Sequence, residues 1–161
     1  MNGVPERPLV IGIGNENRRD DRCGLDVVRS LRDRGPTPAR IVEGGDDATT
    51  LLDLWDGVAR VVVVDAMRSG RPPGTVHRFE VDPESPPGAL PVTSTHGLSL
   101  NEAIGLGRAL GRLPRSLVVY GIEVGDVSPG SGLTPPVAVG VPRAVDQIAE
   151  ELARPGGPGR A

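Results

Sequence analysis

The sequence predicts a three-layer αβα sandwich, in which helices cover both faces of a mostly parallel, five-stranded sheet. Short apolar runs, typical of buried strands, alternate along the chain with segments whose apolar residues recur at helical spacing. The predicted order is β-α-β-α-β-β-α-β-α, and such alternation favours parallel strands joined by helical crossovers. One pair of strands has no helix between its members, which predicts a single antiparallel strand.

The first half of the chain supplies three strands and two helices. Pro8–Gly14 (PLVIGIG) is an apolar run closed by glycines, and Arg60–Ala66 (RVVVVDA) is the clearest buried strand. Gly35 ends the first helix, and Asp46 is a favourable N-cap for the second. The predicted elements are a strand at 8–14, a helix at 21–34, a strand at 39–43, a helix at 46–56 and a strand at 60–66.

The second half supplies two strands and two helices. Thr75–Val81 (TVHRFEV) alternates between apolar and polar residues, which predicts a strand with one wetter face. It follows the preceding strand after a turn-rich link without a helix, so we expect it to be the antiparallel strand. The remaining elements are a helix at 98–111, a strand at 116–124 and a helix at 136–153.

The composition is that of one domain. A chain of 161 residues holds one core, so we expect a single domain at 1–154 and a disordered, Gly- and Pro-rich tail at 155–161. A formal net charge of −3 gives no electrostatic reason to expect a nucleic acid as partner. One cysteine, no apolar signal region and no apolar run of membrane-spanning length favour a cytoplasmic protein without a membrane partner.

Three polar residues, Asp21, Asp65 and His96, follow predicted strands. Because the carboxyl ends of parallel strands share one edge of the sheet, we expect these side chains to converge there. Two carboxylates and an imidazole are a ligand set for a divalent transition metal. An aspartate at a helix start also caps free N–H groups, and one residue of the pair Asp20 and Asp21 would suffice for that. We expect the other, Asp21, to point into the crevice above the sheet.

Other kinds of site are less well supported. Gly12 and Gly14 suggest a nucleotide-binding turn, but Asn17 replaces the third glycine of that fingerprint and the nearby carboxylates would repel a pyrophosphate. Cys23 lies inside a predicted amphipathic helix and His77 lies in mid-strand, so we interpret both as structural. The sequence contains neither a GxSxG elbow nor an HExxH motif.

Several short motifs occur in order and at fitting spacings from Leu9 to about Leu152. They are Gly12-Ile13-Gly14-Asn15, Asp20-Asp21 with Gly24, Val61 to Ala66, Ser94 to Leu98, Tyr120 to Glu123, and Ser128-Pro129-Gly130 through Val141-Pro142. In this combination the chain resembles the hydrogenase maturation endopeptidases, small α/β proteins that process the large subunit of [NiFe] hydrogenases. That family often has an aspartate where this chain has Glu43, so the role of Glu43 stays open.

The resemblance implies that Asp21, Asp65 and His96 bind a metal and are required for processing. The implied reaction is one cut that removes a C-terminal extension from the nickel-loaded large-subunit precursor, an aspartic-type endopeptidase activity that activates the hydrogenase. The precursor would supply the nickel, other divalent metals are expected to substitute, and we expect a monomer. The metal could polarise the scissile carbonyl or activate water, or a carboxylate could act as general base.

Two other functions stay open on the sequence alone. A non-catalytic metal- or nucleotide-binding module predicts stable ligand binding and no trimming of a precursor. A nucleotide-dependent enzyme on the same fold predicts stabilisation by NAD or ATP.

Overall fold

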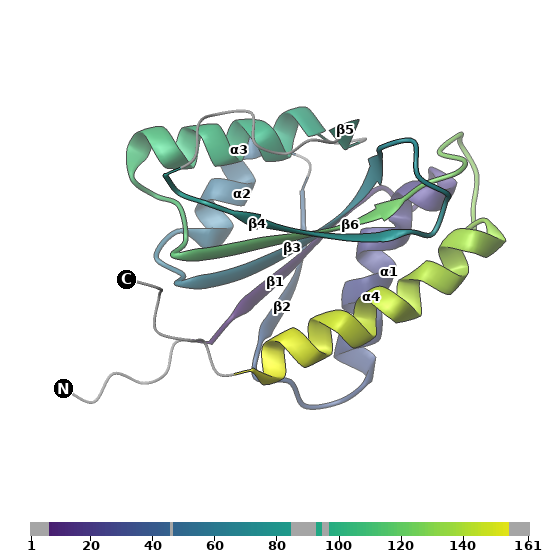
Figure 1. Ribbon diagram of the computed structural model, residues 1–161, viewed down its shortest axis with the longest axis horizontal. Coiled ribbons are helices and arrows are strands. Elements are labelled where there is room, and N and C mark those ends of the chain that lie inside the picture. The colour runs from purple at the N-terminus through teal and green to yellow at the C-terminus, as the bar shows by residue number, and fades with distance from the viewer. Residues whose placement is uncertain (1–6, 46, 85–92, 95–96, 155–161) are drawn as a thin grey trace.

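The computed structural model describes residues 7–45, 47–84, 93–94 and 97–154, with helices on both faces of a central sheet (Figure 1). The strands are β1 (Leu9–Ile13), β2 (Arg40–Gly44), β3 (Arg60–Arg68), β4 (Val76–Val81), β5 (Thr93–Ser94) and β6 (Ser116–Glu123). The helices are the short 3₁₀ helix η1 (Arg19–Arg22) and the α-helices α1 (Cys23–Asp33), α2 (Ala48–Trp55), α3 (Gly97–Leu110) and α4 (Pro135–Ala153). The predicted αβα architecture is confirmed.

The sheet is mixed, with the strand order β2-β1-β3-β6-β4 and with β5 paired to β3 beside this path. β1 pairs in parallel with β2 and β3, and β3 pairs in parallel with β6. β4 is antiparallel to β6, which confirms the antiparallel strand expected at 75–81. The sequence does not predict β5, because a strand of two residues shows no periodicity.

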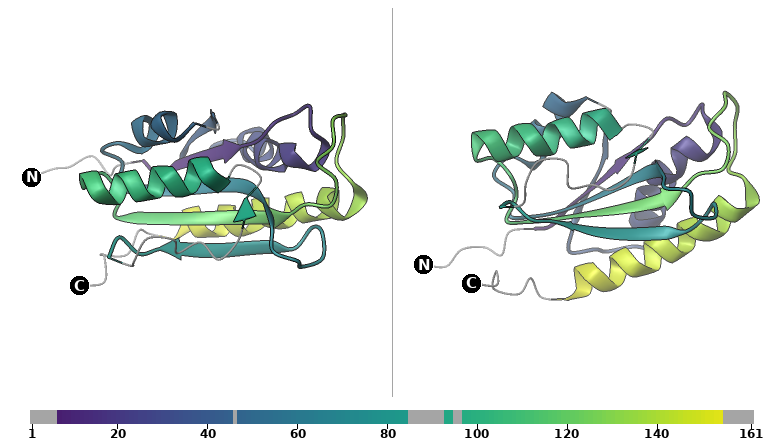
Figure 2. Two further views of the ribbon diagram at one scale, coloured as in Figure 1. Left: turned by 90° about the horizontal axis from the view of Figure 1, so that it is seen from above. Right: turned by 45° about the horizontal axis from the view of Figure 1, so that its top comes forward.

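Two apolar cores lie on opposite faces of the sheet. Figure 2 shows the helices on both sides of the sheet that enclose these cores. α1 and α4 cover one face, where Val62 of β3 and Ile148 of α4 are buried. α2 and α3 cover the other, where Val63 of β3 is buried with Leu51 and Leu100. Neighbouring residues of β3 enter different cores because successive side chains of a strand point to opposite faces. In the described part of the chain, no helix is long and apolar enough to cross a membrane.

The first helix begins differently from the prediction. The sequence predicts one helix from Asp21, but η1 forms a separate 3₁₀ turn and α1 begins at Cys23. Arg19, the first residue of η1, has a φ of 44°, which places it in the left-handed region. A left-handed residue does not continue an α-helix, so the chain makes a distinct turn before it enters α1.

Most other boundaries agree with the prediction to within two residues. β3 continues to Arg68 because it pairs with β6 as far as Met67 and with β5 at Met67 and Arg68. The N-cap of α2 is Asp47, whose carboxylate accepts a hydrogen bond from the N–H of Thr49 at 3.1 Å. The predicted cap, Asp46, and the predicted tail at 155–161 lie outside the described residues.

Candidate functional site

The strand order makes the carboxyl ends of β1 and β3 a topological switch point, the place where open α/β sheets form their binding crevice. β2 lies on one side of β1 and β3 on the other, and α1 and α2 cover opposite faces of the sheet. The loops that leave two such neighbouring strands diverge, and open α/β sheets bind their ligands at this switch point. The loop after β1 leads to Asp21, and β3 carries Asp65.

Asp21 and Asp65 come together at this crevice, and both side chains are fully buried. Asp65 is the first residue of β3 beyond its pairing with β1, which ends at Val64. Asp21 lies in η1, which contacts β3. The negative charges of both carboxylates act on the thiol of Cys23, so both lie near this one side chain. The structure therefore places two of the three predicted metal ligands near the same buried side chain.

His96, the third predicted ligand, lies outside the described residues. β5, the described strand that precedes it, pairs with β3 at Met67 and Arg68, immediately beyond the position of Asp65. Within the described residues, no group of three His, Cys, Asp or Glu side chains could hold a metal ion. A three-ligand site at the crevice would thus need a residue from outside this set.

Close packing of α1 against the ends of β1 and β3 sets the position of Asp21. A Cβ atom on Gly24 would lie 2.6 Å from the carbonyl oxygen of Val64 and closer still to that of Ile13. A Cβ atom on Gly14 would lie 2.5 Å from the carbonyl oxygen of Asp21. Helix and strands touch through their backbones only because these positions lack side chains. The glycines that suggest a nucleotide site in the sequence therefore serve helix packing.

Asp20 holds a distant loop and does not cap a helix. Its buried carboxylate accepts hydrogen bonds from the N–H groups of Gly125 and Asp126, both at 2.9 Å. It also accepts from the N–H of Thr134 at 2.7 Å and from the Thr134 hydroxyl at 2.8 Å. Neither η1 nor α1 has a side-chain cap, so the expected capping role is wrong. The donors lie more than 100 residues away, and no local pattern in the sequence reveals them.

The loop before η1 and the loop between β6 and α4 are joined along their length. Nε of Arg18 donates to the carbonyl of Val127 at 3.1 Å. The N–H of Arg19 donates to the carbonyl of Gly130 at 3.2 Å, and the N–H of Gly130 donates to the carbonyl of Asn17 at 2.9 Å. These bonds hold Arg19 in the left-handed region at a cost of about 1–2 kcal/mol. The strain lies directly before the buried aspartate pair, where it sets the path of η1.

Cys23 is a buried structural residue. Its side chain is fully buried in the core beneath α1 and α4. Burial raises the pKa of its thiol well above the ordinary value of 9.0, and the charges of Asp65 and Asp21 raise it further. Such a thiol stays protonated at neutral pH and is a poor nucleophile and metal ligand. This agrees with the structural role that the sequence favours.

Glu43 forms ion pairs that tie β2 to α1. Its carboxylate accepts hydrogen bonds from Nε and Nη2 of Arg29, at 3.1 and 2.6 Å, and lies 3.6 Å from Arg32. The hydrogen bonds from Arg29 hold the pKa of Glu43 below its ordinary value. Arg29 also binds Glu16 of the loop after β1, at 2.9 Å. The Glu43 carboxylate is therefore engaged in holding this edge of the sheet.

A second polar cluster lies on the strands β4 and β6, beside the position of Asp65 in β3. Gly121 of β6 pairs with Asp65 on one side and with His77 of β4 on the other. Nε2 of His77 lies 3.2 Å from Oε1 of Glu123, which also accepts a hydrogen bond from Ser69. His77 has the structural role that the sequence favours. Glu123, which is 2% exposed, belongs to the motif at 120–123, but sequence reasoning assigned it no role of its own.

Comparison with known proteins identifies the family of this chain. A family model described as hydrogenase maturation protease matches residues 25–151. The hydrogenase expression/formation protein HupD of Bradyrhizobium diazoefficiens is 32% identical over 152 residues, which cover 91% of this chain and 78% of HupD. The hydrogenase 2 maturation protease of Escherichia coli is 29% identical over 153 residues, which cover 93% of each chain.

Two solved structures share the whole architecture. The E. coli hydrogenase maturating endopeptidase HybD has a TM-score of 0.77 and 25% identity over 91% of each chain. The [NiFe] hydrogenase maturation protease HybD of Thermococcus kodakarensis has a TM-score of 0.74 and 30% identity, over 92% of this chain and 99% of the other. These findings support a protease and neither of the two other functions that the sequence left open. The chain therefore belongs to the hydrogenase maturation protease family and is a peptidase.

Proposed function

We propose that this protein removes a C-terminal extension from a nickel-loaded [NiFe] hydrogenase large-subunit precursor by a single cut. The observation that carries the proposal is the pair of buried carboxylates, Asp21 and Asp65, at the switch point of the sheet. Two carboxylates at one buried position attract a divalent cation strongly, because the low dielectric of the interior strengthens the interaction of charges. The names of the relatives support a hydrogenase precursor as substrate.

In this proposal Asp21, Asp65 and His96 bind the nickel ion that the precursor carries. Carboxylate and imidazole donors suit nickel and other first-row divalent metals, and such an ion polarises a carbonyl or acidifies a bound water. Asp65 is well placed to orient the ion, because it lies on a central strand and its Oδ1 accepts the N–H of Ala66 at 2.8 Å. Three protein ligands leave positions for groups of the precursor, so the enzyme would act only on metal-loaded substrate.

Processing of nickel-loaded precursor by point variants tests the site. Asp21→Asn, Asp65→Asn and His96→Ala should each lower cleavage by roughly 100-fold or more, since even outer-shell partners of a metal contribute about 10–100-fold. Asp33→Asn is the matched control, because Asp33 is an exposed carboxylate at the opposite end of α1. This variant should cleave at the wild-type rate.

The metal requirement has its own test. Metal-free precursor should resist the wild-type protein, whereas nickel-loaded precursor should be cut once. Efficient cutting of metal-free precursor would reject nickel recognition. Near-normal cleavage by both Asp65→Asn and His96→Ala would reject the assigned ligands.

We further propose that the protein works as a monomer in the cytoplasm. Its single cysteine is buried, so an oxidising compartment would offer it no internal disulfide. Light scattering on the purified protein and fractionation of cells test these two points. A stable dimer or a periplasmic fraction would contradict them.

A further inference from the structure

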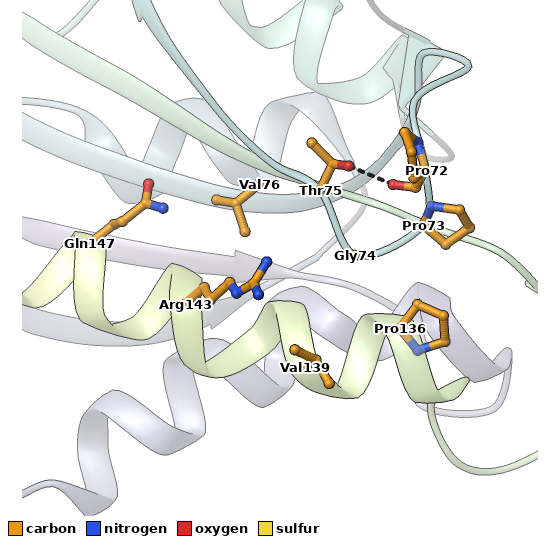
Figure 3. Close-up of a pocket in the computed structure, with 9 residues that line it drawn as sticks. All are labelled: Pro72, Pro73, Gly74, Thr75, Val76, Pro136, Val139, Arg143 and Gln147. Atoms are coloured by element: carbon orange, nitrogen blue, oxygen red, sulfur yellow. Dashed lines mark hydrogen bonds between the residues drawn. The ribbon is translucent and has the colours of Figure 1, made fainter.

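A groove of about 510 Å³ runs between the β3–β4 turn and α4 (Figure 3). One wall is the turn at 72–76, which contains Pro72 and Pro73. The other wall is a single face of α4, because its residues recur at spacings of three and four. These α4 residues are Pro136, Val139, Arg143 and Gln147. The lining is thus mostly apolar, with a cation and an amide at one end.

Backbone contacts fix both walls of the groove. Gly74, with a φ of 89°, donates its N–H to the carbonyl of Glu123 at 2.9 Å, and the N–H of Glu123 donates to Thr75 at 2.9 Å. The Thr75 hydroxyl donates to the carbonyl of Pro72 at 2.6 Å (Figure 3). A Cβ atom on Gly140 of α4 would lie 2.5 Å from the carbonyl oxygen of Gly74, so helix and turn touch directly. A preformed groove of this kind needs little ordering when it binds a ligand.

Arg143 gives the groove a positive charge that no described residue neutralises. The side chain is exposed and forms no ion pair within the described part of the chain. Figure 3 shows it extending from α4 toward the strand and turn opposite. Val139, one helical turn away, is 56% exposed. A guanidinium beside an exposed apolar side chain suits a peptide that carries a carboxylate, which a guanidinium can bind through two parallel hydrogen bonds.

One end of the groove lies near Asp20 of η1. Gly125 lies between the two: a Cβ atom on it would be 3.5 Å from Pro73 of the groove and 3.4 Å from Oδ2 of Asp20. Asp20 is the neighbour of Asp21, and the turn that forms the groove follows directly from β3. A peptide cut at the crevice can therefore continue into the groove.

We propose that the groove binds the end of the precursor's C-terminal extension, with Arg143 pairing its terminal carboxylate and Val139 packing against its apolar side chains. This rests on the proposed function, which supplies a substrate with a free C-terminus. α4 rises about 10 Å from Pro136 to Arg143, a length that about three extended residues span. The groove would then distinguish the precursor from the processed subunit, whose new C-terminus ends at the crevice.

Binding of the extension peptide in two forms tests the proposal. The full-length protein is titrated into labelled peptide that ends in a free acid or in an amide, and fluorescence anisotropy is measured. Wild-type protein should bind the acid up to about fivefold more tightly, the range of an exposed ion pair. Arg143→Gln should bind both forms equally, and Val139→Glu should weaken binding of the acid more than of the amide.

A matched control removes one exposed arginine elsewhere. Arg115 is exposed directly before β6, at the amino end of this strand and away from the groove. Arg115→Gln should therefore keep the wild-type preference for the acid. Equal affinities of acid and amide for wild-type protein, or no binding of either, would overturn the proposal.

Processing kinetics separate this inference from the proposed function. Arg143→Gln should raise KM for nickel-loaded precursor by up to about fivefold and leave kcat unchanged, because it loses ground-state binding only. If wild-type protein cuts no precursor, the proposed function fails. If it cuts and Arg143→Gln shows an unchanged KM, only the assignment of the groove is wrong.

Discussion

Replacing Asp20 with asparagine should loosen the β6–α4 loop and slow processing. Oδ2 of Asp20 accepts three hydrogen bonds, from Gly125, Asp126 and the Thr134 hydroxyl, whereas Oδ1 accepts one from the Thr134 N–H. An asparagine oxygen can replace Oδ2, but its NH₂ group would then face the Thr134 N–H. The Thr134 N–H then loses its acceptor and the NH₂ finds none there; an unsatisfied buried donor costs about 1–3 kcal/mol. Loss of the charge weakens the other three bonds, so we expect about 3 kcal/mol of destabilisation in all.

Urea denaturation and thermal unfolding measure this effect. For a chain of this length about 3 kcal/mol corresponds to a fall in Tm of roughly 6–12 °C. Asp20→Ala should cost more, because it leaves all four donors without an acceptor, and Thr134→Val should cost about 1 kcal/mol, because it removes one donor. If the effect originates in the Asp20 carboxylate, the loss of stability should be largest for Asp20→Ala, smaller for Asp20→Asn and smallest for Thr134→Val.

The kcat of processing should fall in Asp20→Asn, because loosening of the chain at Asp20 displaces its neighbour, Asp21. Amide exchange at Gly125 and Asp126 should speed up in the same variant, because these N–H groups bond to the Asp20 carboxylate. A change in the free energy of unfolding within about 0.5 kcal/mol of wild type, the size of an ordinary surface substitution, would refute the reasoning.

Three further predictions concern the fold. Gly24→Ala should destabilise the protein by about 1–3 kcal/mol and abolish processing, because the added methyl collides with two strand carbonyls; normal activity would contradict this. Cys23→Ala should still process precursor, and in wild-type protein a thiol reagent should label Cys23 only after unfolding in urea. Burial raises the pKa of Glu151, but hydrogen bonds from Arg78 and Tyr120 outweigh it and hold the pKa below the ordinary 4.5. The stability that this carboxylate contributes is thus present above about pH 5 and is lost as pH falls. Between about pH 5 and pH 3, the urea midpoint of the wild-type protein should therefore fall more than that of Glu151→Gln.

Local patterns in the sequence predict most of the fold. The apolar run at 60–66 forms β3, and the alternating run at 75–81 forms the antiparallel edge strand, because burial on two faces or one imposes these patterns on a strand. Gly35 is left-handed directly after the first helix, at the point where the sequence ends it. The start of that helix was not predictable, because its 3₁₀ turn depends on bonds from Arg18 and Arg19 to a loop far along the chain.

Some features of the candidate site can likewise be predicted from the sequence, whereas others depend on the tertiary structure. Local patterns in the sequence are enough to place Asp21 after the first strand and Asp65 in the most apolar one. The sequence predicts Asp65 just past its strand, but it lies inside β3, because pairing with β5 and β6 extends this strand beyond the apolar run. Only the tertiary structure decided that Asp20 binds a distant loop and that Glu43 is held by Arg29. It alone also brought the β3–β4 turn opposite one face of α4. Each of these contacts joins residues that are separated in the sequence. Periodicity depends only on residues that are close in the sequence, so it cannot identify a partner that packing of the whole chain brings near.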